Sequence, residues 1–237
     1  MIYSAILAGG SGSRMNISTM PKQFLPLGDK PIIIHTLEKF MMCNRFDAIF
    51  IGVHSNWLSH MTDLLEKYNI NSTNIFIVAG GSDRNDTIFN IIDEIENKFG
   101  INDNDIIVTH DAVRPFVTLR ILNDNIDSAL EYGACDTVIC ATDTIVCSQN
   151  SKTITEIPNR QFMYQGQTPQ SFNIAKLKEL YASLTTNEKE ILTDACKIFV
   201  LKGLDVHLVD GEISNIKITT VPDYKIAQVL VGGIAID

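Results

Sequence analysis

The sequence is organised around one stretch, Leu7-Ala8-Gly9-Gly10-Ser11-Gly12-Ser13-Arg14-Met15, which directly continues the apolar run Ile2–Leu7. An apolar run of this length is typical of a buried strand, and the glycines mark where it ends. Because glycine has no Cβ, the backbone here can adopt positive φ and bring its N–H groups close to an anion. Together with Arg14 and the nearby Lys22, the stretch predicts a binding site for a polyphosphate.

Two common phosphate-binding motifs do not fit this stretch. A P-loop ends in Gly-Lys-Ser/Thr, whereas Gly12 is followed by Ser13 and Arg14. A dinucleotide fingerprint has its third glycine where Met15 stands. The simpler alternative is a glycine-rich loop that only turns the chain, but the basic residues directly after an N-terminal strand favour phosphate binding.

The composition indicates a globular enzyme-sized domain and excludes several classes of protein. The 237 residues suit one α/β domain, and a net charge of -9 argues against binding nucleic acid through a basic surface. No apolar run approaches the roughly 20 residues of a membrane span, and no signal-peptide pattern precedes the first strand. The five cysteines form no Cys-x-x-Cys pair. We therefore expect free thiols in a cytoplasmic protein that binds no membrane.

Strand-like runs alternate with helical patterns along the chain. This alternation predicts a single Rossmann-like α/β domain over residues 1–237, with a mostly parallel central sheet and crossover helices. Strands are expected at residues 2–7, 48–53, 74–78, 105–110, 135–142, 206–209 and 216–219. Helices are expected at residues 31–40, 55–68, 119–132, 174–184, 187–201 and 222–231, with another around Ile88–Ile95.

The regular alternation breaks between Asp143 and Phe172. Two short apolar segments, Ile145–Cys147 and Thr153–Thr155, are joined by the polar residues 148–152. Such a pattern predicts a β-hairpin. We expect it to form an arm, at about 143–170, that projects from the sheet.

Two further stretches place polar groups directly after predicted strands. Gly80-Gly81-Ser82, with Arg84 and Thr87 just beyond, can bring backbone close to a base or ribose; an ordinary capped turn is the alternative. Asp111 would repel phosphates unless a divalent cation lay between, and Mg²⁺ commonly binds one or two carboxylates plus substrate phosphates. The alternatives for Asp111 are a local turn hydrogen bond or an ion pair with Arg114.

Lys217 and His110 complete the polar groups near predicted strand ends. Lys217 lies in a short apolar alternation, where an unpaired ammonium would be costly; either a phosphate or an acidic residue would be its partner. His110 adjoins an apolar strand, so a packed, hydrogen-bonded side chain is expected rather than a metal ligand. No nucleophile elbow or zinc-ligand spacing is present. The pattern favours phosphoryl or nucleotidyl transfer by positioning and electrostatic stabilisation.

Taken in order, these residues resemble the 2-C-methyl-D-erythritol 4-phosphate cytidylyltransferase family. The matching pieces span nearly the whole chain: residues 7–15, Pro21-Lys22-Gln23-Phe24, Gly80-Gly81 with Arg84, His110–Pro115, Gln167-Thr168-Pro169-Gln170 and Asn215-Ile216-Lys217. Within that family, the runs Ile157–Arg160, Tyr164–Phe172 and Leu192–Lys197 are similar to the D-ribitol-5-phosphate cytidylyltransferases. That branch makes CDP-ribitol for teichoic acid of the cell wall or for capsule.

The resemblance implies a role for individual residues. Backbone around Leu7, Ala8, Gly9 and Gly10 would bind the nucleotide, with Gly81, Ser82 and Thr87 at the base and ribose. Arg14, Lys22 and Lys217 would act on the triphosphate as catalytic cations, and Asp111 would hold Mg²⁺ and thereby the nucleotide. The acceptor would be bound by Arg114, Thr144, Arg160 and Thr168. The arm would cross to a second subunit of a homodimer, so that Arg160 and Thr168 serve the partner's site.

The implied reaction joins CTP and D-ribitol 5-phosphate to give CDP-ribitol and pyrophosphate. A dehydrogenase that forms ribitol 5-phosphate is the implied functional partner. The nearest alternative is the same transfer onto 2-C-methyl-D-erythritol 4-phosphate in isoprenoid synthesis. More distant alternatives are a sugar nucleotidyltransferase that uses UTP or GTP, and a regulatory nucleotide-binding module without chemistry.

Overall fold

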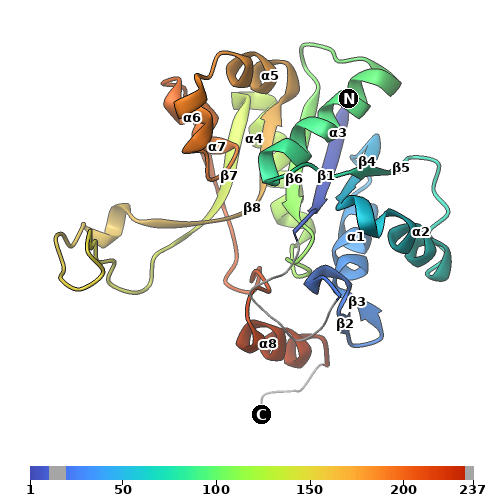
Figure 1. Ribbon diagram of the computed structural model, residues 1–237, viewed down its shortest axis with the longest axis horizontal. Helices are drawn as coiled ribbons and strands as arrows, with labels where there is room; N and C mark the ends of the chain where they lie inside the picture. The colour runs from blue at the N-terminus through green and yellow to red at the C-terminus, as the bar shows by residue number, and fades with distance from the viewer. Residues whose placement is uncertain (11–19, 233–237) are drawn as a thin grey trace.

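A computed structural model describes residues 1–10 and 20–232, in which one sheet carries helices on both faces (Figure 1). Within these residues the sheet has the strand order β5-β4-β1-β6-β8-β7-β9. Its strands are β1 (Ile2–Ala8), β4 (Ala48–Val53), β5 (Ile75–Ala79), β6 (Ile106–Asp111), β7 (Ala134–Cys140), β8 (Tyr164–Asn173) and β9 (His207–Asp210). A separate short pair joins β2 (Pro26–Leu27) to β3 (Lys30–Pro31) in antiparallel register.

The sheet is parallel except at one strand. β1 pairs in parallel with β4 and β6, β4 with β5, and β7 with β9. β8 alone runs antiparallel, between β6 and β7. The predicted single α/β domain with a mostly parallel sheet is confirmed. The two neighbours of β1 in the sheet, β4 and β6, both come after it in the chain. The strand order therefore changes direction at β1, and open sheets of this kind bind their ligands at such a point.

Each face of the sheet packs against its own set of helices. One face carries α1 (Ile32–Met42), α2 (Leu58–Lys67) and α4 (Leu119–Tyr132), and the other carries α3 (Arg84–Phe99), α5 (Ile174–Ala182) and α7 (Cys196–Leu201). Side chains alternate between the two faces with a period of two: Ile49 and Ile51 join the first core, whereas Ala48 and Phe50 join the second. Strands buried on both sides produce the apolar runs seen in the sequence.

A smaller apolar cluster closes the end of the molecule at which the glycine-rich turn emerges. It joins the β2–β3 pair to Val113 after β6, to Ile218, and to Ala227 of the last helix, α8 (Val221–Gly232). Figure 1 shows α8 beside β2 and β3, at the end of the sheet where β1 and β6 terminate. This cluster brings the segment of Lys217 back beside the end of β6, since the Ile218 amide donates to the Val113 carbonyl at 2.9 Å.

The segment between β7 and β8 projects far from the body as an arm (Figure 1). The Ala141 amide donates to the Met163 carbonyl at 2.9 Å and closes its base. The predicted pairing of two short strands at 145–147 and 153–155 is wrong in detail, because a single bridge between Cys147 and Glu156 is formed. A short helical turn, η3 (Arg160–Phe162), leads from the arm into β8.

Three other predictions differ from the structure. β8 was not predicted, since its buried side chains include Gln167, Thr168 and Gln170, which give no apolar alternation. The strand expected at 216–219 is irregular backbone instead, and its Ile218 amide is hydrogen-bonded to the Val113 carbonyl just after β6. The single helix expected at 187–201 is divided into α6 (Thr186–Glu190) and α7.

The remaining predictions about the whole chain concern thiols and membranes. All five cysteines are free; Cys43, Cys135 and Cys196 are buried, whereas Cys140 and Cys147 are exposed. Over residues 1–10 and 20–232, no helix combines the length and apolar character needed to cross a bilayer.

Candidate active site

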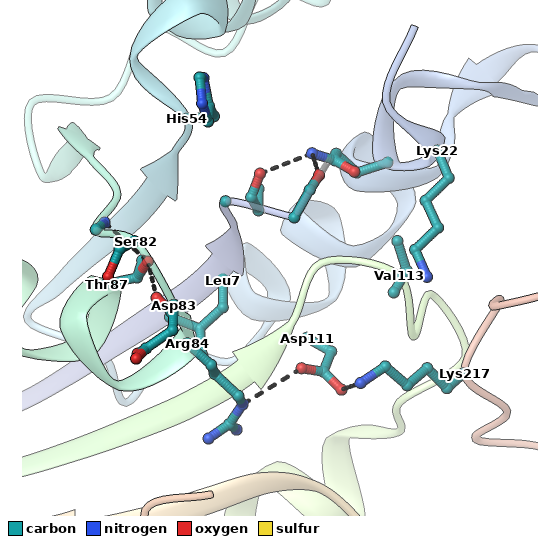
Figure 2. A pocket seen from close by; sticks show the side chains of 15 residues that line it. Leu7, Lys22, His54, Ser82, Asp83, Arg84, Thr87, Asp111, Val113 and Lys217 are labelled. Carbon is teal, nitrogen blue, oxygen red and sulfur yellow. Dashed lines mark hydrogen bonds and ion pairs between the residues drawn. The ribbon is translucent and has the colours of Figure 1, made fainter. Parts of the chain in front are cut away.

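A pocket of about 610 Å³ opens at the carboxyl ends of the parallel strands. Residues from the ends of β1, β5 and β6, from the beginning of α3, and Lys217 from the late loop converge on it (Figure 2). Its lining includes ten of the residues predicted from the sequence: Leu7, Ala8, Gly9, Gly10, Lys22, Gly81, Ser82, Thr87, Asp111 and Lys217. The structure thus brings together the predicted nucleotide-binding residues and two of the three predicted catalytic cations. The third, Arg14, lies outside the described residues.

The turn after β5 is held by a network centred on Thr87. The Gly81 amide donates to Thr87 Oγ1 at 3.0 Å, and Thr87 Oγ1 donates to the Asp83 carbonyl at 2.8 Å. Asp83 also caps α3, since its carboxylate accepts from the Asp86 amide at 2.9 Å. The capped turn considered as an alternative is therefore present, and the same turn lines the pocket.

We expect Gly81→Ala to distort this turn. A Cβ on Gly81 would lie 2.2 Å from the Asp86 Cβ and 2.8 Å from its carbonyl carbon, so backbone must move. Overpacking of this kind costs about 1–3 kcal/mol. Thermal unfolding should show that loss, and titration with CTP should show weakened binding. Gly10→Ala is the stability control, because a Cβ there meets no described atom within 4 Å; equal stability of the two variants would contradict the prediction.

Asp111, at the end of β6, is surrounded by three cations. Its Oδ2 lies 2.9 Å from Lys217 Nζ and 3.5 Å from Arg114 Nε, and its Oδ1 lies 3.7 Å from Arg84 Nε. Arg84 and Lys217 approach the carboxylate from opposite sides (Figure 2). Burial alone would raise the pKa of Asp111, but the charges of Arg84, Lys217 and Arg114 hold the pKa of this carboxyl well below its usual range. Asp111 is therefore ionised at neutral pH.

Two ion pairs that the sequence left open as alternatives are present in the structure. Asp111 does pair with Arg114, and Lys217 does have an acidic partner, which is Asp111 itself. Lys217 also lines the pocket and its side chain is 40% exposed, so the ammonium remains accessible to a phosphate. The pairing therefore does not exclude the phosphate-binding role.

Behind Asp111, a buried network fixes the end of β6. The Asp111 amide donates to Thr168 Oγ1 at 3.1 Å, and Thr168 Oγ1 lies 3.0 Å from His110 Nδ1. His110 Nε2 lies 3.1 Å from the Arg114 carbonyl, which can only accept, so this ring nitrogen carries the proton. Burial lowers the pKa of His110 to about 4, which keeps the imidazole neutral. His110 is thus a packed, hydrogen-bonded residue, as its sequence context predicted.

The four predicted acceptor residues fall into two groups, and none of them lines the pocket. Arg114 and Thr168 are buried; Arg114 Nη1 donates to the Asn215 carbonyl at 2.7 Å, which ties the Lys217 loop to β6. Thr144 and Arg160 lie on the exposed arm, where Arg160 Nη1 donates to the Thr142 carbonyl at 2.9 Å. Within one chain, the arm residues are separated from the pocket.

Sequence reasoning missed several residues of the pocket wall: Gln23, His54, Asp83, Arg84 and Val113. Arg84 had been noted only as a neighbour of the glycine pair. Its position in the first turn of α3, after a strand and two glycines, is the signal that could have placed it at the pocket. His54 directly follows β4, but a polar residue after a strand is too common to identify a site.

A partly buried carboxylate lies near the same arginines. Burial raises the pKa of Asp136 on β7 to about 6, although the positive charges of Arg84 and Arg114 act to lower it. Its Oδ1 has no hydrogen-bond partner among the described residues. An acid whose pKa is raised on folding stabilises the protein below its unfolded pKa of about 4, and this contribution is lost as the pH rises through 6.

We therefore expect the stability of Asp136→Asn relative to the wild type to increase by roughly 2–3 kcal/mol between pH 4 and pH 7. The free energy of unfolding of the variant must be compared with that of the wild type at each pH. Both proteins become more stable as the pH rises through this range, because the pKa of His110 is lowered on folding. Urea unfolding of both proteins at each pH measures this free energy. A difference that stays constant across this range would show that the pKa of Asp136 is not raised on folding.

The mostly parallel sheet, the glycines at the carboxyl end of β1 and the cations around Asp111 are typical of α/β proteins that bind nucleotides. The family model described as 2-C-methyl-D-erythritol 4-phosphate cytidylyltransferase matches residues 2–233. The chain belongs to this family and is a nucleotidyltransferase of the cytidylyltransferase type.

Solved structures agree with this assignment. The chain is similar to a 4-diphosphocytidyl-2C-methyl-D-erythritol synthase from Anaerococcus prevotii, with 27% identity and a TM-score of 0.79 over 98% of this chain and 96% of that one. It is also similar to the 2-C-methyl-D-erythritol 4-phosphate cytidylyltransferase of Francisella tularensis, with 25% identity and a TM-score of 0.77 over 95% and 97% of the two chains. The corresponding enzyme of Thermus thermophilus, at 21% identity and a TM-score of 0.73 over 98% and 100%, shares the fold.

Proposed function

We propose that this protein transfers the cytidylyl group of CTP to a polyol phosphate and releases pyrophosphate. The observation that carries the proposal is the pocket itself, in which the glycine turn, the Gly81 turn and two lysines surround Asp111. An acidic protein that binds a triphosphate must concentrate its cations locally. Lys22, Lys217 and Arg84 line this one pocket, and we assign Arg14 to the same triphosphate.

The nucleotide is proposed to bind across the ends of β1, β5 and β6. Backbone at Leu7, Ala8, Gly9 and Gly10 would bind phosphate, because consecutive N–H groups form an anion-binding concavity. Gly81, Ser82 and Thr87 would contact the base and ribose. This division is supported by the positions of the two turns on adjacent parts of the pocket wall.

Asp111 is the proposed ligand of a magnesium ion. Over residues 1–10 and 20–232, no group of three or more His, Cys, Asp or Glu side chains is arranged to hold a metal. A single ionised carboxylate fits Mg²⁺ when the other ligands are phosphates and water. Such an ion would neutralise charge on the triphosphate. Binding of the ion to Asp111 would compete with Lys217, which we expect to pair with phosphate instead.

The proposed reaction is in-line attack by a phosphate oxygen of the acceptor on the α-phosphorus of CTP. The new oxygen–phosphorus bond forms as the bond from the α-phosphorus to the bridging oxygen breaks, and pyrophosphate leaves. No general base is needed, since the second pKa of a phosphate monoester is about 6. Lys22, Lys217 and Arg14 would stabilise the charge that accumulates as two anions meet.

The acceptor is proposed to lie beside Asp111, with Arg114 on that side and the arm supplying Thr144 and Arg160. Thr168, which the resemblance assigned to the partner's site, accepts a hydrogen bond from the Asp111 amide of its own chain, so we propose that it acts beside that Asp111 instead. Because the arm residues are separated from the pocket of their own chain, we propose that the arm at about 143–170 reaches a partner in a homodimer. Exposed apolar side chains along the arm support this: Val146, Ile154, Ile157, Phe162 and Tyr164. Sedimentation showing a monomer at working concentration would remove the assignment of Arg160 to a neighbouring site.

We propose D-ribitol 5-phosphate as the acceptor. The support is the resemblance of residues 157–172 and 192–197 to the ribitol-phosphate branch, which would link the enzyme to a dehydrogenase and to teichoic acid or capsule synthesis. The second candidate is 2-C-methyl-D-erythritol 4-phosphate, and the comparisons favour it, because the family description and the similar structures carry its name.

One assay separates the two acceptors. Pyrophosphate release from CTP and Mg²⁺ is measured in parallel with D-ribitol 5-phosphate and with 2-C-methyl-D-erythritol 4-phosphate. Our proposal expects kcat/KM to be at least 100-fold higher with ribitol phosphate. The reverse ratio would assign the enzyme to methylerythritol phosphate, and release with UTP or GTP alone would refute the proposed nucleotide.

A further inference from the structure

Gln23 lies directly beneath the glycine-rich turn. It belongs to the short 3-10 helix η1 (Lys22–Phe24), and only 2% of its surface is exposed. Its side-chain amide nitrogen donates to the Ala8 carbonyl at 2.7 Å and to the Gly10 carbonyl at 3.0 Å. Both N–H bonds of one side chain are therefore used on two carbonyls of the same backbone segment.

The geometry of the peptide bond gives these contacts a consequence. In a trans peptide, the carbonyl oxygen and the N–H of the next residue point in opposite directions within one plane. A Gln23 amide that holds the Ala8 carbonyl therefore turns the Gly9 N–H to the opposite side. Gly9 and Gly10 both line the pocket. An Ala8 carbonyl held by Gln23 cannot turn toward an anion, and the Gly9 N–H faces the other way, where it can donate.

The same helix also carries a cation of the site. Lys22 lines the pocket. Phe24 anchors η1, because the centroid of its ring lies 5.3 Å from that of Trp57 and 4.9 Å from that of His60. Gln23 thus links an anchored helix bearing Lys22 to the backbone of the glycine turn. The two parts are held as one unit.

We infer that Gln23 is a positioning residue for the triphosphate: by holding the Ala8 and Gly10 carbonyls it orients the Gly9 N–H and fixes this part of the backbone relative to Lys22. This inference rests on the proposed function, because it assumes that a nucleotide phosphate occupies the turn. It assigns Gln23, which also lines the pocket, a role that acts through the backbone of Ala8 and Gly10.

Two substitutions test the role. Gln23→Met keeps the approximate volume but has no donor, and Gln23→Glu replaces the donor nitrogen with oxygen. Two neutral hydrogen bonds are together worth about a 10- to 100-fold change in an equilibrium constant. We expect Gln23→Met to weaken binding of CTP with Mg²⁺ by about that factor in calorimetric titrations, while KM for the acceptor changes less than twofold.

Gln23→Glu should show a pH dependence of CTP binding that would be absent if the Gln23 side chain only filled space. An ionised carboxylate faces two carbonyl oxygens and repels both, whereas the protonated acid can donate to one of them. We therefore expect CTP to bind this variant more weakly than Gln23→Met at pH 8, and to regain affinity, relative to wild type, as the pH falls to 6. Gln228→Glu, on an exposed position of α8, is the matched control and should bind CTP like the wild type.

The possible outcomes are distinct. CTP affinity of Gln23→Met equal to that of the wild type would overturn the inference, and so would equal affinities of both variants at every pH. Failure of both variants to fold would also overturn it, since Gln23 would then be needed for folding rather than for orienting the turn. A wild-type protein that does not bind CTP with Mg²⁺ would instead overturn the proposed function.

Discussion

Replacing Lys22 by alanine is expected to lower kcat/KM for CTP by about 10³-fold and to leave the fold intact. Loss of one preorganised donor to a developing charge typically costs 10²–10³ in turnover, and Lys22 is proposed to neutralise charge on two anions at once. Lys22 lines the pocket from η1, and the ring of Phe24 anchors this helix against Trp57. The fold should therefore not depend on the ammonium.

The measurement is pyrophosphate release at saturating acceptor, accompanied by thermal unfolding. Lys225→Ala is the matched control, because it removes the same charge from an exposed position on α8. The control should retain wild-type turnover. Near-normal turnover of Lys22→Ala would exclude the catalytic role of Lys22, and a large fall in melting temperature would show that the lost activity reflects unfolding.

Asp111→Asn is expected to have an effect on turnover of similar size, at least 10³-fold, for a different reason. The substitution removes the proposed metal ligand and also leaves three cations facing a neutral amide. Removing one partner of a buried ion pair costs up to 3–5 kcal/mol; because Lys217 is 40% exposed, we expect a smaller loss of about 2 kcal/mol here.

Calorimetric titration measures the loss of the metal ligand, and unfolding measures the loss of stability. In the wild type, Mg²⁺ should strengthen CTP binding, and in Asp111→Asn it should not. Because the pKa of Asp111 is depressed on folding, its stabilising contribution is present above about pH 4 and is lost as the pH falls below that value. The stability gap between wild type and variant should therefore shrink in acid. Asp103→Asn, on an exposed loop, is the control; a magnesium effect on CTP binding that survives in Asp111→Asn would contradict the metal assignment.

The strands with the clearest signal in the sequence are those whose side chains are mostly apolar on both faces. β1, β4 and β6 appear as apolar runs because helices cover both sides of the sheet. β8 has no such signal, since Gln167, Thr168 and Gln170 are buried but polar. Their hydrogen bonds, such as those between Gln167, Glu212 and Asn215, connect segments about 45 residues apart, and local periodicity does not report them.

The pocket shows the same division. Glycines followed by basic residues indicated where an anion could bind, and these residues do converge. The partners of each side chain were less predictable: the sequence left Lys217 with two possible partners, and only the fold placed it 2.9 Å from Asp111. Gln23 directly follows Lys22 in the sequence, but no role could be predicted for it, because its contacts with Ala8 and Gly10 depend on how η1 packs beneath β1.

The most direct test of the central claim is a crystal structure of the protein with CTP and Mg²⁺. We predict that the triphosphate lies against the backbone of Gly9 and Gly10, within hydrogen-bond distance of Lys22 Nζ, with the metal on Asp111. Phosphates bound elsewhere, for example in the groove between α4 and β9 that includes Arg120, would contradict the account.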